Sequence, residues 1–533
     1  MTAPAGGSVI APADIGERRL GWTPRRRVAV FTAAAVAWAV SQAGLGDEIV
    51  NVDGWSSFAD FWTAILDPDL SAQFLRLTAD AAVTTVAYAV LGTALSLVLG
   101  VLGALATAEL LVGTGAPGRL ARAVLVVPRS VHEVIWALLL IQVLGFDPLV
   151  AVLAIGIPFG AVTAKVFAET IDEAEPNPYH RLRSSGAGKL TALAYGVVPS
   201  VSGELVSYSF YRLECAIRSA AVLGVVGAGG LGFQLDLSFE SLRYNEIWTL
   251  IAALMVLSGT ADWWSSTVRH TRRDAARRSS VVVAMALVPL SWIAVDVTFS
   301  SLWSPRTRRR FGDLLADLFP PRLGPGGWSE LIDASRDTVA MSLIALALAA
   351  VGGLALGAAS ARPTARTRRP SRPGTASRLV GRLALLLFRA VPAPIWAFLF
   401  VLVLYPGLWP GAVALGVYNL GVLGRLYSES FEERDPAATD ALVVRGASPT
   451  ETFCYATLPA TAPRLVSLTL YRWEVITRET VVVGVVGAGG LGQLINEDLA
   501  ARDFAAVSSA VIALIVICLA IDALSAAIRR RLR

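Results

Sequence analysis

Gly224 to Gly232 read GVVGAGGLG, and Gly484 to Gly492 read the same nine residues 260 positions later. The same offset aligns a long upstream flank of polar, glycine and proline positions, for example Trp136 with Trp396, Gly186 with Gly446, and Glu214 with Glu474. A repeat of this length indicates a duplicated domain and not a short solenoid unit. We therefore interpret the chain as two similar halves joined in one polypeptide.

The composition is that of a membrane protein. Of 533 residues, 55% are hydrophobic and 16% are charged, with a mean hydropathy of +0.59, whereas a soluble domain carries about 25% charged residues. Uncharged runs such as 281–295 and 507–521 recur along the chain. A run of about 20 apolar residues crosses the bilayer as a helix, which satisfies its own backbone there. We predict an all-α polytopic protein with about twelve transmembrane helices, six in each half.

The expected spans alternate with polar connections. They lie near 27–43, 80–112, 130–147, 148–168, 199–226 and 245–266 in the first half, and near 279–299, 336–360, 385–405, 409–428, 462–486 and 504–527 in the second. The predicted division is a cytoplasmic tail 1–26, a first half 27–267, a basic cytoplasmic linker 268–278, a second half 279–528 and a cytoplasmic C-terminus 529–533.

Clusters of arginine and lysine orient the spans, because basic loops stay on the cytoplasmic side. The clusters are Arg18 to Arg27, Arg119 to Arg129, Arg181 to Lys189, Arg269 to Arg278, Arg362 to Arg382 and Arg529 to Arg533. They share one side if both termini are cytoplasmic, and only the loop Arg306 to Arg310 disagrees. The charge of +5 is thus scattered over turns, which argues against a nucleic-acid surface and for contact with membrane lipid.

Three cysteines and three histidines are scattered without metal-ligand spacing, so neither a disulfide framework nor a metal site is predicted. The chain has no G-x-x-x-x-G-K-[ST] phosphate loop, and we predict no cofactor and no hydrolase activity. GAGGLG does contain G-x-G-x-x-G, but a dinucleotide site needs a strand before it and a helix after it. Here a membrane helix precedes the phrase in both halves.

We interpret the phrase as a break where the backbone approaches a neighbour closely. Small residues permit such contact in membranes, and only glycine adopts positive φ cheaply. The positions concerned are Gly227, Gly229, Gly230 and Gly232, with Gly487, Gly489, Gly490 and Gly492 in the second half.

A second repeated pattern lies in the connection upstream of each phrase. Gly186 precedes Pro199 by 13 residues, and Gly446 precedes Pro459 by 13. This resembles the loop that permeases of ABC importers present to their ATPase, with the pattern E-A-A, three residues, G, nine residues, I, one residue, L-P. The acidic position is Asp440 in the second half but His180 in the first. The resemblance implies two ATPase-coupling loops, which begin near Glu169 and Glu429.

The wider flanks resemble the permeases of phosphonate and phosphite ABC importers. The segments that carry this resemblance are PRSVHEVIWALLL, AKVFAETIDE and FYRLECAIRSAAVLGVVGAGGLG in the first half, and YRWEVITRETVVVGVVGAGGLG in the second. The family implies an external solute-binding protein, two copies of a cytoplasmic ATP-binding subunit, and two permease copies, here fused in one chain. His132 and Glu133 are replaced by Pro392 and Ala393, so any role of that pair is restricted to one half.

Charged residues within the fifth span of each half are candidates for the translocation pathway. Glu214 precedes Arg218 by four residues, so the two lie on one helix face in the favourable order for an ion pair. Arginine binds phosphonate oxygens well because its donors form a planar fork. A purely structural lock between helices is the alternative. The candidates are Arg212, Glu214 and Arg218, with Arg472, Glu474 and Arg478.

The sequence thus predicts the membrane-spanning permease of an ATP-driven importer in the cytoplasmic membrane, with phosphonate or a related phosphorus oxyanion as its substrate. An importer permease for methionine or another small solute is the alternative within the class. An ion-coupled secondary transporter is an alternative from another class, although its repeats are often inverted. A membrane scaffold is disfavoured by the repeated Glu/Arg pairs.

Overall fold

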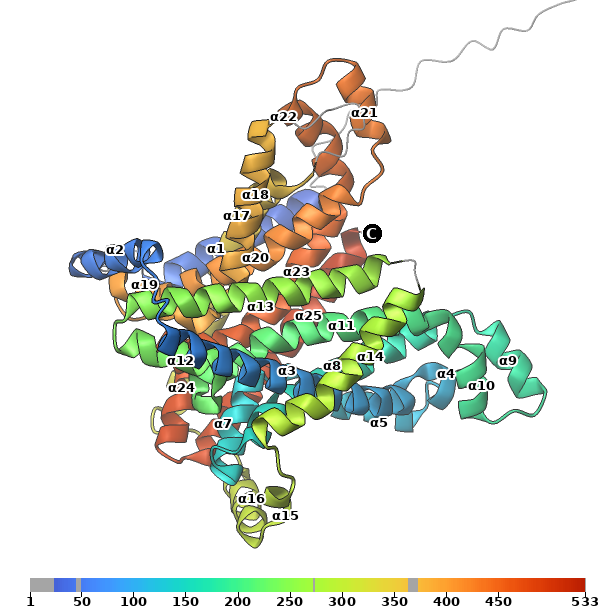
Figure 1. Cartoon of the computed structure of the whole chain (residues 1–533). Coiled ribbons are helices and arrows are strands. Elements are labelled where there is room, and N and C mark those ends of the chain that lie inside the picture. Colours follow the sequence, from blue (N-terminus) through green and yellow to red (C-terminus); the bar gives the residue numbers. More distant parts are fainter. Residues whose placement is uncertain (1–23, 45–48, 272–273, 363–371, 533) are drawn as a thin grey trace, which may run out of the picture.

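The computed structural model describes residues 24–44, 49–271, 274–362 and 372–532 (Figure 1). The tail 1–23, two residues of the predicted linker and part of the cluster Arg362 to Arg382 lie outside these ranges. Within them the chain is helical, apart from one isolated bridge between Val50 and Leu404. The predicted all-α class is confirmed.

The helices of the two halves follow one another in the same order. The first half contains α1 (Pro24–Gln42), α2 (Trp55–Thr63), α3 (Ala72–Thr107), α4 (Glu109–Val112), α5 (Ala116–Val124), α6 (Val126–Ser130), α7 (Glu133–Leu144), α8 (Pro148–Glu173), α9 (Asn177–Ser184), α10 (Lys189–Gly196), α11 (Val198–Leu223), α12 (Gly230–Glu240) and α13 (Tyr244–His270). The second contains α14 (Asp274–Val295), α15 (Ser300–Trp303), α16 (Pro305–Leu318), α17 (Gly327–Ser360), α18 (Arg372–Ala390), α19 (Ala393–Val403), α20 (Leu408–Glu432), α21 (Ala437–Val444), α22 (Pro449–Thr452), α23 (Leu458–Val485), α24 (Gly490–Ala500) and α25 (Phe504–Leu532).

Six of the described helices are long and apolar enough to cross a membrane, and the number rises to ten if each of four bent pairs is one span. The six are α3, α8, α13, α14, α17 and α25. The two remaining predicted spans fall on α1, whose apolar part Val30–Gln42 is short, and on α20, whose second half contains Arg425 and Glu429.

The third and fifth predicted spans of each half belong to pairs of helices joined at a bend. The chain turns by 86° between Ser130 and Glu133, and by 95° between Ala390 and Ala393. His132 caps the new helix α7, since its Nδ1 accepts the Val134 N–H at 3.3 Å. Pro392 precedes α19, and proline both lacks an N–H and disfavours a helical residue before it. The span expected over 130–147 therefore corresponds to α7, which begins at the bend, whereas the span expected over 385–405 is corrected to the end of α18 and α19 with a sharp bend between them.

The halves are interlocked through their first helices. α1 packs against α17 of the second half, and α14 packs against α3 of the first. Outside these helices, the Asn51 N–H donates to the Val403 carbonyl at 2.9 Å. Within each half the main pairs are α3 with α8 and α17 with α20, where small residues let the backbones approach. A Cβ at Gly357 would lie 2.6 Å from the Gly424 carbonyl oxygen.

Two helical excursions project from the body at α9–α10 and at α21–α22 (Figure 1). The segment α15–α16, which contains the basic cluster Arg306 to Arg310, lies away from both of them, at the bottom of the view. The one cluster that disagreed with the predicted orientation is thus separated in space from the two loops that resemble ATPase-docking loops.

Candidate functional site

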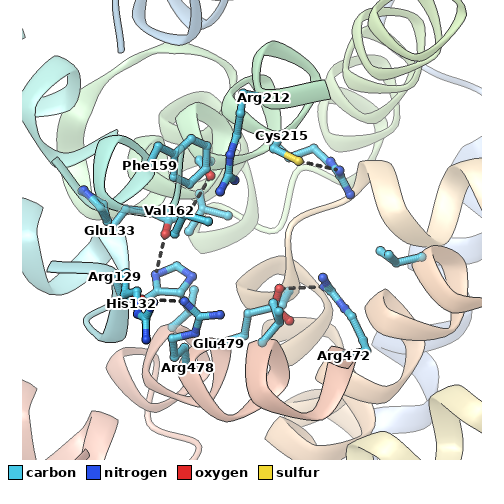
Figure 2. A pocket seen from close by; sticks show the side chains of 18 of the residues that line it. Arg129, His132, Glu133, Phe159, Val162, Arg212, Cys215, Arg472, Arg478 and Glu479 are labelled. Atoms are coloured by element: carbon cyan, nitrogen blue, oxygen red, sulfur yellow. Dashed lines mark hydrogen bonds and ion pairs between the residues drawn. The ribbon is translucent and has the colours of Figure 1, made fainter. Parts of the chain in front are cut away.

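A cavity of about 160 Å³ lies between the two halves. α11 and α23 supply most of its wall, with residues from α6, α7 and α8 of the first half and α19 and α20 of the second (Figure 2). Many lining residues form pairs 260 positions apart, such as Tyr211 with Tyr471 and Val162 with Val422. Equivalent residues of the two halves therefore face each other across the cavity.

Positive charge dominates the cavity wall. Five arginines line it against two carboxylates, those of Glu133 and Glu479. The arginines are Arg129, Arg212, Arg218, Arg472 and Arg478, four of which are sequence-predicted pathway residues. Charges at this depth are costly in a membrane protein unless they face a pathway or a partner. The wall is suited to an anion small enough for the cavity.

Arg212 projects from α11 into this space (Figure 2). Its Nε donates to the Tyr208 hydroxyl at 2.9 Å, and its guanidinium carbon lies 4.6 Å from the centroid of the Phe159 ring. The residue is 8% exposed. No carboxylate within the described part of the chain forms an ion pair with it.

Arg472, its counterpart on α23, is held differently. Nη2 donates to Glu479 Oε1 at 2.7 Å, and Nε donates to the Asn419 side-chain oxygen. The Asn419 amide in turn donates to Glu479 Oε2 at 2.8 Å. Arg472 is thus paired with a carboxylate, although its repeat equivalent Arg212 is not.

Glu133, which occurs in the first half alone, has its own partners. Its Oε1 accepts a hydrogen bond from the Ser219 hydroxyl at 2.6 Å. Its other oxygen lies 3.4 Å from Nδ1 of His132. The Ser219 hydroxyl therefore orients the carboxylate, and no described arginine lies within ion-pair distance of it.

The two predicted Glu/Arg pairs are present but unequal. Glu474 and Arg478 approach to 3.4 Å, and Arg478 Nη1 also donates to the Arg129 carbonyl at 2.6 Å. Glu214 and Arg218 are 3.8 Å apart. Glu214 is instead held by two arginines of the other half.

The buried ionic network around Glu214 joins the halves. Glu214 Oε1 lies 3.0 Å from Arg425 Nη1 and 3.5 Å from Arg389 Nη1. Both arginines also pair with Asp262 of α13, Arg389 at 2.7 Å. Arg425 completes its contacts with Glu429 at 2.9 Å. The network supports the structural-lock interpretation for Glu214, whereas Arg218 lines the cavity.

The two loops upstream of the cavity helices have the same backbone turn. The Gly186 N–H donates to the Arg183 carbonyl and the Ala187 N–H to the Leu182 carbonyl, both at 3.1 Å; Gly446 and Ala447 make the equivalent bonds at 3.0 and 3.1 Å. Both glycines have φ of 87°. This is the Schellman turn, in which a left-handed residue satisfies the last carbonyls of a helix.

Other loop residues predicted from the sequence lie around this turn. Glu169 and Glu429 lie near the ends of α8 and α20, Asp440 is in the first turn of α21, and Pro199 and Pro459 begin α11 and α23. In the second loop a capping box starts α22. The Ser448 N–H donates to Glu451 at 2.7 Å, which lowers the pKa of that carboxyl.

The repeated glycine phrase forms the bend between a long helix and a short one. The first and second copies bend the pairs α11–α12 and α23–α24 by 55° and 44°. Gly227, Gly229 and Gly230, and likewise Gly487, Gly489 and Gly490, have positive φ. A Cβ at Gly232 would lie 1.8 Å from the Ala221 carbonyl oxygen, and one at Gly492 would lie 2.6 Å from that of Val481. In each copy the following leucine N–H donates to a threonine of α3 or α17 at 2.9 Å.

Several residues of the cavity and the network were not among the sequence candidates. They are Arg129, Asp262, Arg389, Asn419, Arg425 and Glu479. A signal for some of them was available, because Asp262 repeats as Asp522, and Arg425 as Lys165, at the offset of 260. Charges repeated within apolar spans mark positions that the fold uses.

The fold and cavity define a membrane permease built from two like halves. The chain belongs to the family described as "Binding-protein-dependent transport system inner membrane component", which matches residues 96–264 and again 353–533. It is therefore an ABC-importer permease, and the predicted fusion of two copies in one chain is confirmed. The protein is multi-pass in the membrane.

The matching relatives agree with the narrower resemblance. The chain is 30% identical over 459 residues to the Phosphate-import permease protein PhnE of Mycolicibacterium smegmatis, with 85% of each chain covered. It is 30% identical over 252 residues to the Phosphite transport system permease protein PtxC of Stutzerimonas stutzeri, which covers 47% of this chain and 90% of the relative. A solved structure of the MetNI methionine ABC transporter aligns with 40% of this chain and 100% of its own, at 20% identity and a TM-score of 0.35. The predicted resemblance to permeases of the phosphonate and phosphite type is confirmed.

Proposed function

We propose that this permease carries a phosphorus oxyanion (phosphonate, phosphite or phosphate) from an external binding protein into the cytoplasm. The observation that carries the proposal is the excess of arginine over carboxylate in the cavity between the halves. A tetrahedral oxyanion presents several acceptor oxygens to guanidinium donors, and such charge-assisted bonds are about twice as strong as neutral ones. The names of the relatives support the same class of substrate.

The cavity is less suited to the alternative substrate, methionine. A zwitterionic amino acid needs an anionic group for its ammonium as well as an apolar pocket. Glu479 is occupied by Arg472 and Asn419. Glu133, held by the Ser219 hydroxyl, is then the one lining carboxylate without a described arginine partner, and it stands against five lining arginines. The net positive wall favours a ligand that carries only negative charge.

Energy comes from a separate ATP-binding subunit in this proposal, with one copy at each of the two loops. An exposed tyrosine, Tyr195 in one loop and Tyr455 in the other, is 77% and 75% exposed at repeat-equivalent positions. A large aromatic side chain that is left exposed on a short helical segment is suited to a partner's cleft. With the loops in the cytoplasm, the basic clusters orient both termini to that side.

The test is uptake by the full chain together with its ATPase and binding protein, reconstituted in vesicles. ATP-dependent accumulation of radiolabelled phosphite, methylphosphonate or phosphate is the expected result. Accumulation of methionine but of no phosphorus oxyanion would replace the substrate class. Uptake driven by an ion gradient in vesicles that hold this chain alone would overturn the permease mechanism.

A further inference from the structure

The two walls of the cavity differ in their polar side chains, although their backbones follow one repeat. Three of the differing pairs of positions concern the repeated arginines or the two lining carboxylates. Ser219 is replaced by Glu479, Glu133 by Ala393, and Phe159 by Asn419. Phe159 contacts Arg212 in the first half, whereas Asn419 and Glu479 contact Arg472 in the second. Glu133 bonds to Ser219 and not to the arginine.

On the second-half wall the arginine is saturated. Glu479 accepts from Arg472 at 2.7 Å, and Asn419 contacts both the arginine and the carboxylate. A carboxylate held by two donors in this way is already neutralised locally. An incoming anion would have to displace it, and would gain little from a guanidinium whose charge is compensated.

On the first-half wall the arginine is braced but uncompensated. The Phe159 ring and the Tyr208 hydroxyl hold the guanidinium by one face and by Nε. The terminal amino groups have no hydrogen-bond acceptor among the residues that the structure describes. The side chain is more than nine-tenths buried and faces the cavity (Figure 2). Its free edge is the two-donor fork that binds oxyanions.

We propose that the fused permease has one asymmetric oxyanion site, on the first-half wall, in which the terminal amino groups of Arg212 bind the substrate. Arg472 is structural in its pair with Glu479. This inference rests on the proposed function and refines it, because it assigns substrate recognition to one repeat only. Duplication within a single chain permits this specialisation, since each half can change independently.

The test compares two charge-removing variants at repeat-equivalent places in the full importer. Arg212→Gln deletes the free guanidinium, and the double variant Arg472→Gln with Glu479→Gln removes the compensated pair without leaving a bare charge. Uptake of phosphite and methylphosphonate by Arg212→Gln should fall at least about tenfold, the value of one charge-assisted hydrogen bond. The loss of uptake in the Arg472→Gln with Glu479→Gln variant should be several-fold smaller. Gel filtration and co-purification of the ATPase check that both are assembled.

A transplant of the side chains provides a second route that leaves Arg212 in place. Ser219→Glu with Glu133→Ala gives the first half two of the three side chains of the second and keeps Phe159. The new carboxylate should neutralise Arg212 and suppress uptake. Adding Glu479→Ser frees Arg472 and should restore a large part of it.

The outcomes separate this inference from the proposed function. Equal losses at the two walls, or normal uptake by Arg212→Gln, would overturn the single site while leaving the substrate class intact. Suppose that the variant with Ser219→Glu, Glu133→Ala and Glu479→Ser assembles with the ATPase but takes up no more substrate than the variant with Ser219→Glu and Glu133→Ala alone. This result would also overturn the single site. No uptake of any phosphorus oxyanion by the unmodified importer would overturn the proposed function, and this inference with it.

Discussion

Glu214 of α11 accepts a hydrogen bond from Arg425 of α20 at 3.0 Å, across 211 positions of sequence and across the boundary between the halves. The carboxylate side chain is 4% exposed and is also approached by Arg389. Asp262 completes the cluster, so the buried Glu214 and the partly buried Asp262 face the buried Arg389 and the partly buried Arg425. Removal of one member would leave a desolvated charge without its partner, so the cluster stabilises the contact between the two halves.

Glu214→Gln should therefore destabilise the protein. Loss of one partner from a buried ionic cluster costs about 3 kcal/mol, and the melting temperature of the purified chain in detergent should fall. Glu474→Gln is the matched control, because Glu474 is 23% exposed and contacts a single arginine at 3.4 Å. Its loss should cost about 1 kcal/mol or less. Equal shifts in the two variants would show that the network does not hold the halves together.

The Schellman turns at Gly186 and Gly446 give a prediction about coupling. Valine at either position must adopt φ of 87°, which costs about 1–3 kcal/mol for a residue with a Cβ. The local helix should shift, and co-purification of the ATPase and ATP-dependent uptake should fall, more strongly for Gly446→Val, whose loop follows the family pattern more closely. The measurement is the yield of ATPase retained on the tagged permease.

Gly145→Val is the control for this strain. Gly145 also has positive φ, at 73°, with open space around it, but it lies in the turn between α7 and α8. It should retain the ATPase. If all three variants keep the ATPase equally well, the loops are not its docking site.

The close approach at Gly232 predicts intolerance of a single methyl group. The Cβ of Gly232→Ala would meet the Ala221 carbonyl oxygen at 1.8 Å, so α11 and α12 cannot keep their bend. We expect little folded protein after purification. Gly312→Ala, whose Cβ meets nothing within 4 Å, should accumulate normally. Normal yield and uptake of Gly232→Ala would show that the bend is adjustable.

The sequence predicts features that depend on residues close together in the chain better than contacts between residues that are far apart in it. Helix periodicity and the glycine phrase are local, so the all-α class and the glycine-rich break were predictable. The bend before Glu133 was not, because it depends on a cap by His132 within an apolar run. The contact of Glu214 with Arg425 was also hidden, since helix geometry offered Glu214 a nearer partner in Arg218. The sequence does show that Ser219 is replaced by Glu479 in the second half. That this difference pairs Arg472 and leaves Arg212 unpaired could be predicted only with the positions of Phe159 and Asn419 in the structure.

The exchanged first helices predict that neither half is stable alone. α1 covers α17, and α14 covers α3, so each half expressed separately leaves an apolar helix face without its partner. A chain cut after Thr271 and expressed as two polypeptides should assemble only when both are made together. A tag on the first half should then retain the second. Phosphite uptake should return to within about twofold of the intact chain, because joining the halves in one polypeptide raises their effective concentration but adds no contact between them. Stable accumulation and uptake by one half alone would contradict the exchanged packing, and so would co-expressed halves that fail to bind each other.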